Sequence, residues 1–372
     1  MPAIQPPPAL PPSESSSYDS FGRVSSSLDF AGNKTVYAYD QLGRVSSKSF
    51  YISTNYNTPQ ETVSYHFDSL GRNDTVTDVN NGNTRVTSYG FDLDNRVTSV
   101  TTPEGTINYV YDQATGRHTE TSTTNSDILY GYDQLGRVKT VTVTKQNGVV
   151  LGTSLLITYF YTPVGNIDHI TYPNGTETDY GYDTLNRLTS VTNKVTASGN
   201  MLSSYSYTVN ADGMRTGVTE HQLESDGTTS TTTKTWSYDN LQRLTGETVV
   251  SSISGNSYTD TYSYDLVGNR LSKTDVVGST TTVATDSFNA DDQLTSETGT
   301  VNGSSSWSTS FQYDLNSSLT SVTRTGTGAE SDTYGYDLQH RLSSANITRT
   351  EQWCMSPSAS KAATHGCAGP VC

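Results

Sequence analysis

Tyr132-Asp133-Gln134-Leu135-Gly136-Arg137-Val138 is the stretch of sequence that decides the fold. The motif begins with an aromatic residue and an aspartate. Two positions of variable residue type follow, and then a glycine, an arginine and an aliphatic residue. The same pattern returns, in places degraded, from near the start of the chain almost to its end. A catalytic or ligand-binding Asp–Arg pair is needed once and not at every turn. We therefore interpret the recurring Asp and Arg as scaffold residues, with the aspartate starting a turn and the arginine stacked on or paired with a neighbouring copy.

Each copy of the motif predicts a β-hairpin. The residues before it alternate in character, as in Tyr130-Gly131-Tyr132, and so does the Val- and Thr-rich run Val138–Val143 after it. Between the two runs, Gly136 stands where the chain must reverse with positive φ. Other copies carry asparagine at this position, Asn95 and Asn186 among them, and asparagine is the next most tolerant residue for that conformation. This exchange indicates a requirement of the backbone.

The copies recur at a spacing of about 24 residues, which is typical of a repeat architecture with one supersecondary unit per copy. A second turn separates consecutive hairpins, and four of these turns carry the Asn-Gly signal of tight hairpins, at Asn81, Asn147, Asn174 and Asn302. Each repeat thus holds two strands and two turns, and its leading aromatic is expected to stack in a ladder with those of its neighbours. The leading aromatics of the fourteen copies are Tyr18, Tyr39, Phe67, Phe91, Tyr111, Tyr132, Tyr161, Tyr182, Tyr207, Tyr238, Tyr264, Phe288, Tyr313 and Tyr336.

Seven copies keep most of the motif, and their residues are the predicted structural sites of the chain. They are Tyr39, Asp40, Gly43, Arg44, Phe67, Asp68, Gly71, Arg72, Tyr132, Asp133, Gly136, Arg137, Tyr182, Asp183, Asn186, Arg187, Tyr238, Asp239, Arg243, Tyr264, Asp265, Arg270, Tyr336, Asp337 and Arg341. Other copies are degraded. The copy at Tyr161 lacks both Asp and Arg, and the copy led by Tyr207 has Thr208 in place of the aspartate.

The composition fits a thin, wet sheet better than a thick apolar core. Only 32% of the residues are hydrophobic, yet 25 tyrosines supply apolar faces that have a polar end. The formal net charge of -15 opposes nucleic-acid backbones and anionic lipid, so neither is an expected partner. No apolar run is long enough to span a membrane, and no conventional signal peptide is visible.

Three regions are expected. Residues 1–17 form a disordered Pro- and Ser-rich lead-in, residues 18–347 form the repeat sheet, and residues 348–372 form a disordered tail. The three cysteines, Cys354, Cys367 and Cys372, all lie in this tail, so disulfides do not hold the repeats together.

No catalytic, cofactor or metal site is predicted. Cys354, His365, Cys367 and Cys372 lack the paired spacing of a zinc site. Asp78–Asn83 has the look of a calcium loop but lacks the closing bidentate glutamate, and turn chemistry explains it better. None of the histidines of the repeat region has a neighbouring Ser or Cys in a nucleophile motif.

The recurrence of Tyr-Asp-x-x-Gly-Arg-Val/Leu resembles the YD-repeat, or Rhs, family. Tyr39–Val45 and Tyr132–Val138 match its core almost letter for letter, and the resemblance covers roughly residues 18–345. Family members include bacterial polymorphic toxins, the B and C components of insecticidal Tc toxins, wall-associated proteins and teneurins. The resemblance implies an all-β strip of antiparallel hairpins that spirals into a hollow shell, which in the toxins encloses an effector. The shell of those toxins ends in an autocleaving core segment with Asp-Pro motifs. This sequence contains no Asp-Pro, so self-cleavage is not implied.

The sequence therefore predicts a partial, open shell, a fragment or degenerate member of that family, without enzymatic activity or cofactor. We expect a structural, encapsulating module of a secreted or cell-surface bacterial protein, with an enclosed polypeptide as its partner. The alternative is a cell-surface module that binds carbohydrate through exposed tyrosines. The two terminal strands are expected to be unpaired edges that favour edge-to-edge self-association.

Overall fold

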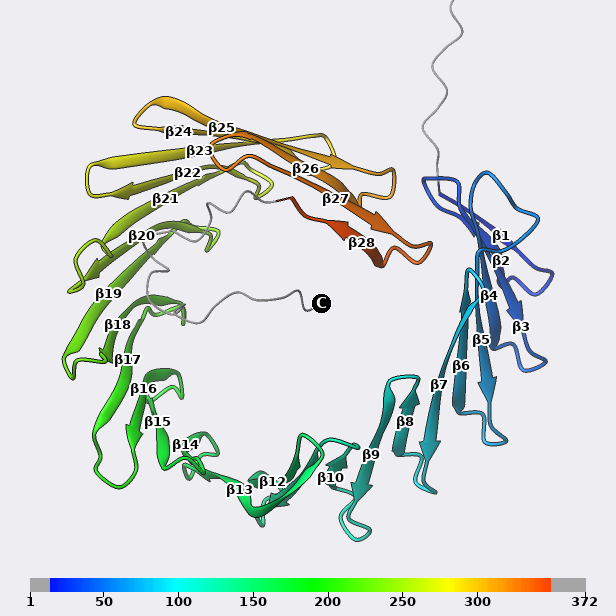
Figure 1. Cartoon of the computed structure of the whole chain (residues 1–372), viewed down its shortest axis with the longest axis horizontal. Coiled ribbons are helices and arrows are strands. Elements are labelled where there is room, and N and C mark those ends of the chain that lie inside the picture. Colours follow the sequence, from blue (N-terminus) through cyan, green and yellow to red (C-terminus); the bar gives the residue numbers. More distant parts are fainter. Residues whose placement is uncertain (1–13, 349–372) are drawn as a thin grey trace, which may run out of the picture.

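A computed structural model describes residues 14–348 of the 372-residue chain. All regular elements in this range are β-strands, and 28 of them form a single sheet (Figure 1). The predicted all-β fold of antiparallel hairpins is confirmed. The predictions for residues 1–13 and 349–372, which include the cysteines, lie outside the described residues.

The strands, in chain order, are β1 (Ser15–Tyr18), β2 (Val24–Leu28), β3 (Lys34–Tyr39), β4 (Val45–Tyr51), β5 (Glu61–Phe67), β6 (Asn73–Asn80), β7 (Asn83–Phe91), β8 (Val97–Thr102), β9 (Gly105–Tyr111), β10 (His118–Ser122), β11 (Asp127–Tyr132), β12 (Val138–Gln146), β13 (Val149–Tyr161), β14 (Ile167–Thr171), β15 (Thr176–Tyr182), β16 (Leu188–Val195), β17 (Met201–Val209), β18 (Arg215–Leu223), β19 (Thr229–Tyr238), β20 (Leu244–Ser251), β21 (Tyr258–Tyr264), β22 (Arg270–Val277), β23 (Thr280–Phe288), β24 (Leu294–Val301), β25 (Ser304–Tyr313), β26 (Leu319–Gly326), β27 (Glu330–Tyr336) and β28 (Leu342–Asn346). The first strand begins at Ser15, slightly before the boundary expected at residue 18.

Each strand pairs antiparallel with the next one in the sequence. The 28 strands make 14 hairpins, which is one for each copy of the motif. The sheet does not close on itself by strand pairing, since β1 pairs only with β2 and β28 only with β27 among the described residues. Both terminal strands are exposed along their whole length, as expected for free edges.

The two kinds of turn lie on opposite sides of the sheet and form its two rims. The turns of the motif join odd strands to even ones, as β11 to β12, and form the motif rim. The connections from even to odd strands, as β12 to β13, form the opposite rim. On the opposite rim, Asn81-Gly82, Asn147-Gly148 and Asn302-Gly303 have positive φ at both residues, as predicted for tight hairpins. The prediction was wrong for Asn174, whose φ is not positive: Tyr172–Thr176 instead forms a wider turn with only Gly175 in the left-handed region.

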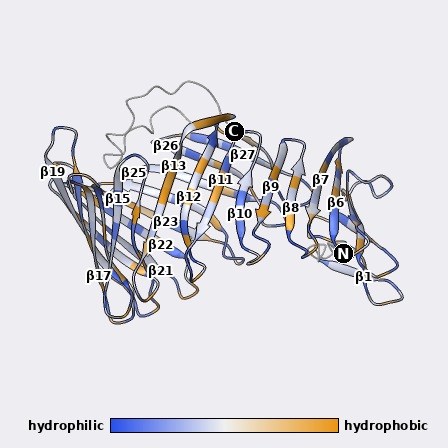
Figure 2. Cartoon of the chain, turned by 90° about the horizontal axis from the view of Figure 1, so that it is seen from below, coloured by the Kyte–Doolittle hydropathy of each residue, from blue (hydrophilic) through white to orange (hydrophobic). Residues whose placement is uncertain are grey.

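The sheet is a single layer with almost no buried apolar core. Among the described residues, five apolar side chains are buried, namely Phe50, Val63, Ile170, Val218 and Val249. Polar and apolar residues are interspersed along the strands over the whole wall (Figure 2). This agrees with the Tyr-rich, weakly hydrophobic composition, and it means that contacts between neighbouring repeats have to hold the wall together.

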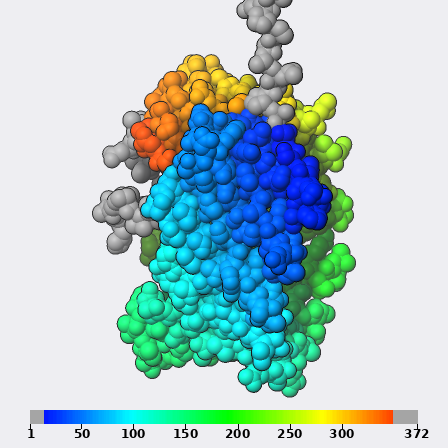
Figure 3. Space-filling model, turned by 90° about the vertical axis from the view of Figure 1, so that its right-hand side faces the viewer, coloured from blue at the N-terminus to red at the C-terminus, as the bar shows by residue number. Residues whose placement is uncertain are grey.

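The wall curves into an incomplete ring, so that its first and last repeats approach each other (Figure 1). Seen from the side, the last repeats lie against the first ones (Figure 3). At this meeting, turns of the motif rim contact the opposite rim: Asn316 Nδ2 donates a hydrogen bond to Asp29 Oδ2 at 3.0 Å across 287 positions. Since unlike rims meet, the strip is a spiral that has advanced by one turn, and we call this contact the seam.

Candidate functional site

The aspartate of the motif builds its turn through both carboxylate oxygens. Asp133 Oδ1 accepts hydrogen bonds from the backbone N–H groups of Leu135 and Arg137, each at 2.9 Å. The backbone N–H of Gly136 bonds the carbonyl of Asp133, and φ at Gly136 is 82°. The strand register shifts between Gly131 and Tyr132, so the turn ends in a β-bulge. The positive φ predicted at Gly43, Gly71, Asn95 and Asn186 is likewise present.

The second carboxylate oxygen holds the arginine of the motif in place. Arg137 Nε donates to Asp133 Oδ2 at 2.7 Å, and Asp40, Asp68, Asp183, Asp239 and Asp337 bind their own arginines in the same way. The pKa of the Asp68 carboxyl is lowered below its usual value, chiefly by the hydrogen bond from the backbone N–H of Arg72. Partial desolvation opposes this lowering, and the hydrogen bond from the Arg72 side chain adds to it. The aspartate therefore acts as a permanently charged clamp at neutral pH.

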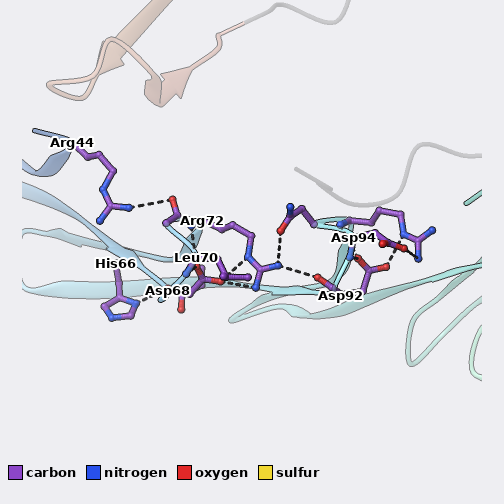
Figure 4. A network of polar contacts seen from close by, with 11 residues as sticks. Arg44, His66, Asp68, Leu70, Arg72, Asp92 and Asp94 are labelled. Carbon is purple, nitrogen blue, oxygen red and sulfur yellow. Dashed lines mark hydrogen bonds and ion pairs between the residues drawn. The ribbon is translucent and has the colours of Figure 1, made fainter. Parts of the chain in front are cut away.

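The arginine then links its own repeat to the next one. The guanidinium of Arg137 lies 4.2 Å from the centre of the Tyr161 ring, the aromatic of the following copy. Figure 4 shows an arginine that joins two earlier repeats by hydrogen bonds. Arg72 bonds Asp68 of its own turn, and its Nη1 donates to the carbonyl of Asp92 in the next turn at 2.9 Å. Arginine thus both pairs within its turn and stacks on the neighbouring copy.

The tyrosine of the motif closes the link in the reverse direction. Tyr161 Oη donates to the carbonyl of Val138 in the preceding repeat at 2.6 Å, and Tyr39, Tyr182, Tyr264 and Tyr336 make equivalent bonds. The expected ladder of stacked aromatics is corrected by this geometry. In the best-kept copies the arginine of one copy covers the aromatic ring of the next copy, because the guanidinium satisfies both that ring face and its own aspartate.

In two copies the motif positions are occupied by residues other than those predicted. The turn assigned to Tyr207 is Asn210–Met214, so Val209 occupies the aromatic position and Asn210 the aspartate position. In the turn at Asp265, the arginine position is occupied by Asn269, whose Nδ2 donates to Asp265 Oδ2. Arg270 lies one residue further on.

Arg270 therefore does not bind the aspartate of its motif turn and forms a different ion pair. Its Nε bonds Asp286 Oδ2 at 2.7 Å, and Asp286 is buried in β23. The sequence pattern could not separate these registers, because the neighbouring positions 269 and 270 both suit the turn.

The seam is formed by polar residues, most of which the sequence did not single out; Arg341 was predicted only as a motif arginine of its own turn. Gln339 and Arg341, in the last motif turn, both donate to Glu61 Oε1, the latter at 2.9 Å. Arg341 also lies 3.7 Å from Asp78 Oδ2, and His340 Nε2 lies 3.9 Å from Asp29 Oδ2. These contacts are not repeated elsewhere in the sequence, so no periodic signal could reveal them.

Glu61 is the most deeply buried large side chain of the described residues, with 2% of its surface exposed. Burial raises the pKa of its carboxyl above the ordinary value; the Asp78 and Asp337 carboxylates add to the rise, and Gln339 and Arg341 oppose it. Glu61 Oε2 and Asp78 Oδ1 find no hydrogen-bond partner within residues 14–348. The charge of Glu61 is therefore only partly compensated in the closed seam.

A cavity lies beside the seam. It has a volume of about 660 Å³ and is lined by residues of the first four strands, such as Phe50 and Tyr51, and by Leu338, Gln339 and His340 of the last motif turn. Within residues 14–348, no group of three or more His, Cys, Asp or Glu side chains is placed to hold a metal ion. Asp78–Asn83 is the end of β6, a hairpin turn and the start of β7.

The motif rim also carries a row of exposed apolar side chains, which occupy the two positions between the aspartate and the glycine. Ten of the turns expose a large apolar residue there, from 61% for Leu315 to 100% for Leu266. This apolar row consists of Phe21, Leu42, Leu70, Leu93, Leu135, Val164, Leu185, Leu241, Leu266 and Leu315. The turn chemistry leaves the residue type at these two positions open, yet leucine recurs there visibly in the sequence.

Comparison with known proteins agrees with this architecture. The family model of the RHS Repeat matches residues 161–201. The crystal structure of TcdB2-TccC3-TEV shares the fold with a TM-score of 0.61 at 14% sequence identity, over 89% of this chain and 20% of that one. The crystal structure of TcdB2-TccC3 gives a TM-score of 0.60 at 13% identity, over 87% of this chain and 22% of that one. This chain thus spans about a fifth of the length of either. No curated protein sequence matches the chain.

In the part of the chain that the structure describes, no helix is long and apolar enough to cross a membrane. The chain thus contains an RHS repeat over residues 161–201, and it shares the fold of the TcdB2-TccC3 structures.

Proposed function

We propose that this chain is a structural module that forms one turn of a shell around another polypeptide. The observation that carries the proposal is the single-layer wall that curves through one turn until its last repeat meets its first at the seam. Over residues 14–348 the sheet buries only five apolar side chains, so this part of the chain is not organised around a core of its own. The structures of TcdB2-TccC3 provide a fold precedent for a longer wall of this kind.

In this proposal the chain has no catalytic role. The recurring Asp and Arg are consumed by turn and inter-repeat contacts, which leaves neither of them free to act on a substrate. We further propose that the module belongs to a secreted or cell-surface bacterial protein of the toxin-delivery kind.

The carbohydrate-binding alternative is less well supported. Ring stacking on a sugar needs an open aromatic face, whereas motif rings such as Tyr39 and Tyr161 are each covered by the arginine of the preceding copy. Their hydroxyl groups are also used in bonds to the backbone.

Protection of a passenger tests the proposed function. A small, protease-sensitive protein is fused after residue 372, and its digestion is compared with that of the free passenger. We expect the fused passenger to be cut more slowly. The matched control is the same fusion with Glu61→Ala and Arg341→Ala, in which the seam should open and protection should fall. Digestion of the fused and free passengers at equal rates would refute encapsulation by this chain.

A further inference from the structure

The apolar row is not explained by the turns that carry it. The turn geometry depends on the aspartate, on the glycine position and on backbone hydrogen bonds, and none of these requires an aliphatic side chain between them. Leucine nevertheless recurs there and stands far out in solvent, as Leu135 does at 77% exposure. Exposed apolar residues that recur along ten of the fourteen turns of one rim indicate an interaction surface.

The seam shows what covers such a residue. Leu338 is the apolar residue of the last motif turn, and at the two positions between the aspartate and the glycine it is the one large apolar residue of the fourteen turns that is not exposed. It lines the same cavity as Phe50 and Tyr51, which lie near the opposite rim of the first repeats. The turn that carries Leu338 is therefore docked on the opposite rim within the chain itself, whereas the other motif turn at the seam contacts that rim through Asn316 and leaves Leu315 exposed.

The opposite rim offers apolar surface elsewhere as well. Val149 and Val150 at the start of β13, Val250 near the end of β20 and Ile253 in the following connection are all exposed, Val150 at 73%. Outside the seam both rims thus carry exposed apolar side chains, and Leu338 beside Phe50 and Tyr51 shows an apolar residue of the motif rim placed against the opposite rim.

We propose that the apolar row is a docking surface for the opposite rim of a second copy of this chain, so that copies stack one wall turn upon the next. The contact is heterologous, since unlike rims meet, and it leaves one free rim at each end of a stack. Stacks can therefore grow beyond a dimer. The inference rests on the wall of the proposed function but needs no passenger.

Sedimentation velocity of the full chain over a range of concentrations tests the proposal. We expect dimers and longer species, favoured by added salt, because salt screens the repulsion between copies that each carry a formal charge of -15. The triple variant Leu135→Ser, Leu185→Ser, Leu241→Ser should weaken association by roughly tenfold or more. The matched control places the same change on exposed residues within strands, as Val110→Ser, Leu129→Ser, Leu156→Ser, and should associate like the parent.

A mixing experiment tests the direction of the contact. The apolar-row triple variant keeps its opposite rim intact, so it should still bind the parent chain and end its stacks, which shifts long species towards dimers. Failure of the mixture to shorten the stacks would point to contact between like rims and overturn the proposal. So would a parent chain that stays monomeric, or equal weakening by the control triple.

Pairing of the free edge strands is the competing explanation for any association. The variant Ser343→Lys, Ala345→Lys adds charge to β28 and blocks such pairing. Loss of association in this variant, with the apolar-row variant unaffected, would overturn the proposal. Because no passenger is present, each of these outcomes is separate from the outcome of the protection assay.

Discussion

Arg341 and Glu61 are 280 positions apart in the sequence, yet Arg341 Nη2 lies 2.9 Å from Glu61 Oε1 and joins the last repeat to the first. The Glu61 side chain is 1% exposed and that of Arg341 52%. The pair is thus a buried anion held by a half-exposed cation. It is strong only while the seam excludes water, and it makes closure of the ring depend on very few side chains.

We expect Arg341→Ala to open the seam. The change leaves the buried Glu61 carboxylate without its cation, which costs about 1–3 kcal/mol locally. The distance between labels at Thr58→Cys and Ser343→Cys, with the three native cysteines changed to serine, should lengthen and broaden in electron-spin distance measurements. Arg243→Ala is the matched control, since it removes a motif arginine far from the seam and should leave this distance unchanged. An unaltered distance in Arg341→Ala would contradict the assignment of the seam.

The seam should close more tightly as the solution becomes mildly acidic. Burial raises the pKa of Glu61 in the closed seam, so the closed form binds this proton more tightly than an open form with an ordinary carboxyl. The stabilising effect is fully present below the ordinary pKa of 4.5 and is lost as the pH rises through the raised value. The same label distance should therefore shorten or sharpen as the pH is lowered from neutral towards the ordinary pKa of 4.5.

Glu61→Gln supplies the control for this pH dependence. The amide oxygen can still accept the bonds from Gln339 and Arg341, but it does not titrate. The variant should hold the seam closed at both pH values. If its pH dependence equals that of the parent, another group is responsible.

Gly43→Ala should destabilise the sheet by about 1 kcal/mol, because alanine is strained in the left-handed conformation. The φ of Gly43 is 80°, and the nearest atom to an added Cβ is Arg23 Nη1 at 3.6 Å, so crowding does not complicate the result. Gly43→Asn should cost less, since Asn95 and Asn186 hold this position in other copies at φ of 64° and 60°. Urea unfolding measures both variants, and equal losses would contradict the backbone explanation.

Local features of the repeat were predictable from the sequence because the same residue types recur at the same positions of each well-kept copy. The aspartate, the left-handed residue and the alternating strands each depend on neighbours a few positions away, so fourteen copies could be read independently. The register of degraded copies was not predictable in this way: Val209 and Asn269 take motif positions only because the hydrogen-bond pattern of the turn places them there.

Contacts made once in the chain left no trace in the pattern. Glu61, Asp29 and Asn316 meet their partners only because the sheet curves through a whole turn, and curvature summed over 28 strands is not written in any single repeat. The apolar row was different. Leucine recurred visibly between the aspartate and the glycine, but only the docked Leu338 gives that recurrence a physical reason.

Arg137 and Tyr161 should show an energetic coupling that spans two repeats. The guanidinium is 4.2 Å from the ring centre and is held by Asp133, so Arg137→Ala loses a stacked contact as well as a partly exposed ion pair. We expect Arg137→Ala to lower the free energy of unfolding by about 1 kcal/mol. Arg137→Lys should lower it by nearly as much, because lysine lacks the planar fork that contacts the ring and the carboxylate together.

Lys139→Ala, at an exposed neighbouring residue, is the control and should change the free energy of unfolding by less than about 0.5 kcal/mol. A double-mutant cycle with Tyr161→Leu should give a coupling of about 0.5–1 kcal/mol. Additive losses in this cycle would mean that the arginine stabilises its own turn alone, and that backbone pairing by itself carries stability from one repeat to the next.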